Sequence, residues 1–99
     1  MMGIPLSGEK LIEIEQLAAL LFSPREICVI AELDFTEVRD CFTDVNDSIY
    51  KSYQKGKLKT IAKEREIVVK LAMEGSSASQ ILVEKYIDEL KTKEANEIS

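Results

Sequence analysis

The chain has 99 residues, of which 45% are hydrophobic and 31% are charged, and its formal net charge is −5. This length suits one small domain, and the composition is that of a globular chain rather than a disordered one. Because the chain has no His and only two Cys, it lacks the commonest acid–base group and cannot assemble a zinc site. We therefore expect no metal, no cofactor and no enzymatic activity.

The sequence also indicates a cytoplasmic location and no contact with a membrane. Residues 1–6 have no basic flank and no long apolar stretch, which argues against a signal peptide. The longest uncharged run, residues 16–24, is far shorter than the roughly 20 residues of a membrane span. In that compartment Cys28 and Cys41 are expected to be small, buried, reduced thiols.

Apolar spacing and helix-capping residues predict an all-α fold. Ser7, Ser23, Asp34 and either Asn46 or Asp47 precede helical patterns as caps, and Ser77 with Gln80 forms a further capping box after Gly75. The predicted helices span residues 8–22, 24–32, 35–42, 47–74 and 77–92. The fourth contains Gly56, which can mark a bend.

The second and third predicted helices are short and joined by a short link, an arrangement typical of a helix-turn-helix. The first helix is expected to cover this pair with Leu17, Leu20 and Leu21. The residues predicted to form the core of the helix-turn-helix are Ile27, Cys28, Ala31, Leu33, Val38 and Phe42. We expect three parts, namely a helix-turn-helix unit over 1–46, a helical hairpin over 47–92 and a flexible tail over 93–99.

Charge is concentrated in one segment. Residues 1–50 carry a net charge of −7, residues 51–70 a net charge of +5 and residues 71–99 a net charge of −3. A basic segment can neutralise DNA phosphates, or it can form ion pairs with the acidic first half of the chain. The predicted DNA-binding residues are Thr36, Arg39, Lys51, Lys55, Lys57 and Lys59.

Two features of the sequence leave alternatives open. Glu37 and Asp40 lie on the outward face of the third helix and would repel phosphates, so that helix serves either DNA reading or packing alone. The apolar residues of the last two helices exceed what one small domain buries readily, so they either fold onto the first three helices or join subunits of a homo-oligomer.

The order of the motifs resembles that of small terminase subunits from tailed bacteriophages. The similar stretches are Ser23-Pro24 with Glu26 and Ile27, then Tyr53, Gly56 and Lys59, then Gly75-Ser76-Ser77 with Gln80. The resemblance covers roughly residues 9–90. It departs at Glu32, where the family usually has glycine in the turn.

This resemblance implies a non-catalytic subunit that recognises double-stranded phage DNA for genome packaging. Such a subunit would form a homo-oligomer and pass DNA to a large ATPase/nuclease subunit of terminase type in the cytoplasm of the bacterial host. The alternatives are a helix-turn-helix transcription regulator and a protein–protein adaptor that does not bind DNA.

Overall fold

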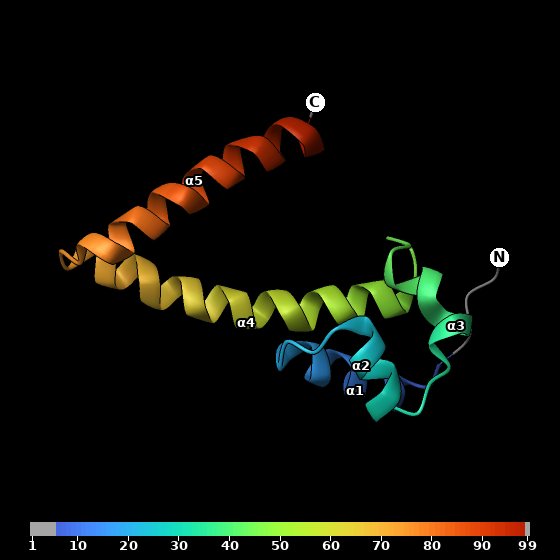
Figure 1. The fold of residues 1–99 in the computed structure, drawn as a ribbon. Helices are drawn as coiled ribbons and strands as arrows, with labels where there is room; N and C mark the ends of the chain where they lie inside the picture. Colours follow the sequence, from blue (N-terminus) through green and yellow to red (C-terminus); the bar gives the residue numbers. More distant parts are fainter. Residues whose placement is uncertain (1–5, 99) are drawn as a thin grey trace. The chain divides into compact units, whose positions relative to one another are not determined.

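The computed structural model describes residues 6–98, and within that range it is helical with no strand (Figure 1). The elements are α1 (Gly8–Ala19), α2 (Pro24–Ile30), α3 (Phe35–Val38), the 3₁₀ helix η1 (Arg39–Phe42), α4 (Ser48–Met73) and α5 (Ser77–Ile98). The all-α prediction is therefore confirmed. Residues 1–5, on which the expectation of no signal peptide rests, lie outside the described residues, as does Ser99.

Three helices end in the same kind of left-handed turn, and two of them end without glycine. The residue after the C-cap has a positive φ in each case: 68° at Leu21, 57° at Glu32 and 103° at Gly75. In each turn the next amide donates to the carbonyl oxygen five residues earlier, as from Leu33 N to the Cys28 carbonyl oxygen at 2.8 Å. These turns end α1 three residues before its predicted end at residue 22, and α2 two residues before its predicted end at residue 32.

Side-chain caps fix most helix starts as predicted. Ser23 and Glu26 form the complete reciprocal capping box of α2, and Asp34 accepts from the Thr36 amide at 2.9 Å. The prediction for α5 is wrong by one residue. Ser76, rather than Ser77, accepts from the Ser79 amide, and the Gln80 side chain donates to the Ala72 carbonyl oxygen instead of reaching back to the cap.

The third predicted helix changes type partway along. Its α-helical part ends at Val38, and residues 39–42 form a 3₁₀ turn rather than a continuation of the α-helix. In a 3₁₀ helix residues three apart lie on one line, so this turn places Cys41 behind Val38 and leaves Phe42 directed into the core. All three side chains are buried.

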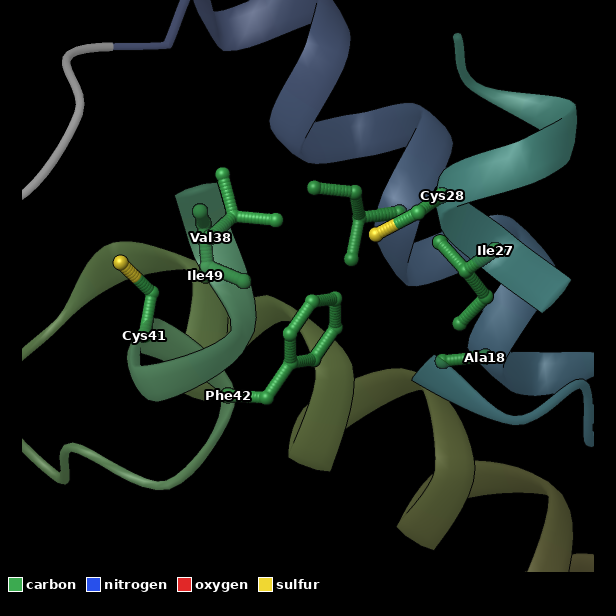
Figure 2. Close-up of a cluster of buried hydrophobic side chains, with 8 residues drawn as sticks. Ala18, Ile27, Cys28, Val38, Cys41, Phe42 and Ile49 are labelled. Carbon is green, nitrogen blue, oxygen red and sulfur yellow. The ribbon is translucent and has the colours of Figure 1, made fainter. Parts of the chain in front are cut away.

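The chain divides into two compact units, with the division between Ile61 and Ala62 inside α4. The boundary predicted from the sequence lies at residue 46. The buried apolar core of the described residues lies wholly in the first unit, and Figure 2 shows the Phe42 ring pointing into the cluster. Its members are Ile14, Ala18, Ile27, Cys28, Val38, Cys41, Phe42 and Ile49.

The expectation for the first helix is wrong in part. Leu17 packs against the core, but Leu20 and Leu21 are 68% and 54% exposed. Both follow Ala19, the last residue of α1, so the turn carries them away from the apolar face that helical spacing would give them. Ile14 and Ala18, both fully buried, are the residues of α1 that belong to the core cluster instead.

Helices α1 and α4 are in contact at Gly56 and at Thr60, and the contact at Gly56 explains why α4 has a glycine there. A Cβ at Gly56 would overlap the backbone carbonyl oxygen of Glu15 and lie 2.9 Å from the Glu15 carbonyl carbon and 3.0 Å from the Ala18 Cβ. One turn later, the Thr60 hydroxyl donates to the carbonyl oxygen of Ala19 at the end of α1. Gly56 therefore permits close packing of two helices, and α4 continues through it without interruption.

The second unit comprises the end of α4 and all of α5. Arg65 on α4 lies 3.8 Å from the Glu89 carboxylate and 4.3 Å from the centre of the Tyr86 ring, both on α5. α5 continues to Ile98, beyond residue 92, where the predicted helix ends and the predicted tail begins. No helix within residues 6–98 combines the length and apolar character needed to cross a bilayer.

Candidate nucleic-acid interface

The outward side of the α2–α3 pair carries an arginine that is not among the predicted DNA-binding residues. Arg25, in the first turn of α2, places its guanidinium 4.4 Å from the centre of the Phe35 ring at the start of α3. This contact brings the two helix starts together and leaves Arg25 exposed. Thr36, the next residue along α3, is also exposed, and its amide is capped by Asp34. The sequence carries no signal of this contact, because Arg25 and Phe35 come together only after the turn between α2 and α3 has folded.

The core predicted for this pair is largely buried. Ile27, Cys28, Ala31, Val38 and Phe42 are at most 5% exposed. Leu33 is half-buried and packs against the cluster from the turn. The outward residues Thr36 and Arg39 are therefore presented by a packed scaffold.

The predicted base-reading face carries both signs of charge. Arg39 is exposed and makes no ion pair with any residue of the described range 6–98. Glu37 and Asp40, its neighbours in sequence, are exposed as well. A carboxylate accepts hydrogen bonds from base amino groups but repels phosphates. Only Thr36 and Arg39 on this face are thus suited to phosphate contact.

The predicted basic residues of α4 fall into two classes. Lys55 and Lys59 lie 3.9 Å and 3.4 Å from the Glu15 carboxylate of α1, so both are occupied by an intrachain ion pair. Lys57 lies 4.9 Å from the centre of the Tyr53 ring, and Lys51 is exposed with no ion pair to residues 6–98. Of the three lysines that recur every fourth residue, Lys51, Lys55 and Lys59, only Lys51 is therefore without an ion pair to a described residue.

Neither cysteine is placed for nucleophilic chemistry. Cys28 and Cys41 are both buried thiols, as expected. Burial raises the pKa of the Cys28 thiol, and the nearby negative charge of Asp34 raises this pKa further. Because the thiolate is the reactive form, this shift and the burial of the thiol both disfavour reaction at Cys28. Within residues 6–98, no group of three or more acidic or thiol side chains is placed to hold a metal ion.

The second unit contains an open apolar pocket of about 280 Å³ between the end of α4 and α5. Its lining comprises Arg65, Val69, Val83, Tyr86, Ile87 and Leu90. The unit has no buried apolar side chain among its described residues. This part of the chain thus offers an apolar surface.

Comparisons of the chain with protein-family models, with curated proteins and with solved structures find no match.

Proposed function

We propose that the chain is a non-catalytic protein that binds double-stranded DNA through α2 and α3, used as a helix-turn-helix. The observation that supports this proposal is that two arginines are exposed on the packed α2–α3 pair. Arg25 is held against Phe35, and Arg39 makes no ion pair with a described residue, so each can contact a phosphate without first breaking a salt bridge. Thr36 lies between them in sequence and supplies a hydroxyl.

The resemblance to small terminase subunits supports a more specific role. In that role the bound DNA is phage DNA at the start of genome packaging, and the partner that receives it is a large ATPase/nuclease subunit. Glu32 takes the turn position where that family usually has glycine, and its φ of 57° is the conformation that glycine favours there. The departure noted in the sequence therefore leaves the turn geometry intact.

Binding of a fluorescent DNA duplex, measured by anisotropy from about 50 to 200 mM salt, tests the proposal. Each lost phosphate contact should reduce the slope of log affinity against log salt by about 0.9. We expect Arg25→Gln and Arg39→Gln each to do so, and Lys91→Gln, an exposed charge in α5, to leave the slope unchanged. Full binding in both arginine variants would remove α2 and α3 from the interface.

We further propose that the second unit joins copies of the chain. The unit exposes apolar side chains around its pocket, among them Ile87 and Leu90, which are 47% and 53% exposed. The second copy is a suitable partner because its charges are complementary. Residues 62–73 carry three basic and two acidic side chains, whereas residues 77–98 carry three basic and five acidic ones. An antiparallel contact would thus set α4 of one copy against the acidic α5 of the other.

Light scattering on the purified chain tests this association. Ile87→Glu with Leu90→Glu should yield a monomer, and Lys85→Glu with Lys91→Glu, which leaves the apolar surface intact, should still associate. A dimer would favour a transcription regulator on a two-fold operator, and a ring of many subunits would favour the packaging role. A monomer in the unchanged chain would contradict the proposed contact.

One observation favours the adaptor alternative. Glu37 and Asp40 are exposed beside Arg39, and two of the predicted lysines already pair with Glu15. If the chain shows no affinity for DNA at about 50 mM salt, where electrostatic binding is strong, an acidic protein-binding surface becomes the better assignment.

A further inference from the structure

The carboxylate of Glu15 lies between two lysines that are one helical turn apart on α4. Its Oε1 is 3.9 Å from the Lys55 Nζ, and its Oε2 is 3.4 Å from the Lys59 Nζ. The lysine side chains are 60% and 59% exposed, whereas that of Glu15 is 30% exposed. The anion is therefore the sheltered member of the group, and the two cations extend into solvent.

The backbone fixes Glu15 in this place. The carbonyl oxygen of the same residue is the atom that packs against Gly56, which lies between the two lysines in sequence. The Thr60 hydroxyl holds the end of α1 one turn further along α4. The backbone of Glu15 cannot move away from the two lysines without separating α1 from α4, and its side chain is shorter than the flexible lysine stems, which can swing outward into solvent.

We propose that Glu15 occupies an internal phosphate site, in which its carboxylate takes the position that a DNA phosphate would take between Lys55 and Lys59. This inference depends on the proposed DNA binding and concerns its regulation. In the unchanged chain the Glu15 carboxylate neutralises both lysines, so DNA affinity comes from the other basic residues. The carboxylate thereby limits non-specific attraction to DNA.

Removal of this single negative charge tests the proposal. Glu15→Gln keeps the size of the side chain and releases both lysines. Two additional phosphate contacts would steepen the salt slope by about 1.8, so the ratio of affinities at about 50 and 200 mM salt should rise about twelvefold. The variant Glu15→Gln with Lys55→Gln and Lys59→Gln should lose this gain.

Glu13→Gln provides a matched control. Glu13 is on the same helix and pairs with Lys10 at 3.1 Å, so its replacement removes the same charge from α1 without releasing a lysine of α4. A circular dichroism spectrum of each variant verifies that the helices persist.

The outcomes separate this inference from the function on which it depends. A gain in Glu15→Gln that exceeds the gain in Glu13→Gln and disappears in the triple variant supports the internal site. Equal gains in the two single variants, with binding by the unchanged chain, overturn the internal site and leave DNA binding in place. Absence of binding by the unchanged chain and by every variant at about 50 mM salt overturns both.

Discussion

Replacement of Gly56 by alanine tests the closest contact between α1 and α4. In an exposed helix this change would stabilise the protein by about 1 kcal/mol, because alanine has the higher helix propensity. At Gly56 the new methyl group would overlap the Glu15 carbonyl oxygen and lie 2.9 Å from its carbonyl carbon. Carbon atoms in contact are normally about 3.5–4.0 Å apart, so one helix has to move by more than half an ångström.

The expected net effect is a loss of stability. Overpacking of this kind costs about 1–3 kcal/mol or more, and the shift would also weaken the hydrogen bond from Thr60 to Ala19, worth about 1 kcal/mol. After the gain in propensity is subtracted, we expect Gly56→Ala to destabilise the first unit by about 1–3 kcal/mol. For a domain of this size the melting temperature should fall by about 5–20 °C.

Thermal unfolding followed by near-ultraviolet circular dichroism measures this effect, because Tyr53 packs edge-on against Phe42 with ring centres 5.5 Å apart. Gly8→Ala is the matched control. It lies in α1 with no atom within 4 Å of the added Cβ, so its melting temperature should stay the same or rise slightly. A melting temperature that rises in Gly56→Ala would refute the close packing of α1 on α4.

Three further predictions concern the turns, the caps and the buried thiol. Leu21→Gly and Glu32→Gly should each stabilise the chain by up to about 1 kcal/mol in urea unfolding, because both residues have a positive φ that glycine adopts without strain. Ser76→Ala should cost about 1 kcal/mol and Ser77→Ala much less, because Ser76 is the cap of α5. Burial raises the pKa of Cys28, so the native thiol keeps its proton at a pH where the unfolded thiol loses it. Stability should therefore be complete below pH 9.0, the ordinary value, and decrease as the pH rises above it.

Each of these has a result that would contradict it. Lower stability in both glycine variants would mean that the two turns do not need a left-handed residue. A larger loss in Ser77→Ala than in Ser76→Ala would move the cap by one residue. For the thiol, the control is Cys28→Ala, whose urea midpoint should change less between pH 8 and 10.5. An equal change in both proteins would exclude Cys28 as the cause.

Local chemistry explains why so much of the helical framework could be predicted. A serine or aspartate before an apolar pattern marks a helix start, and Ser7, Ser23 and Asp34 each cap the helix expected of them. The helix ends were harder to predict. Leu21 and Glu32 both have a positive φ, a conformation that glycine usually supplies at the end of a helix. Because neither turn has a glycine at that position, neither could be predicted from the sequence.

The candidate site was less predictable because it depends on contacts between distant residues. Four-residue spacing correctly places Lys55 and Lys59 one turn apart, but it does not show that both form ion pairs with Glu15, which lies 40 and 44 residues earlier in the chain. Arg25 was missed for the same reason, since its contact with Phe35 exists only after the turn has folded. The net charge of a segment does not show which of its charged side chains form ion pairs in the folded protein.

The division of the chain inside α4 has a consequence for how the molecule opens. One continuous helix runs from a region with a buried apolar core into a region in which none of the described residues, 62–98, has a buried apolar side chain. Amide protons near Ile49 should exchange with solvent only when the whole first unit unfolds, whereas those beyond Ile61 should exchange through local fraying in the isolated chain. A truncated chain ending at Ile61 retains every member of the apolar core cluster. It is therefore the fragment to test first for independent folding.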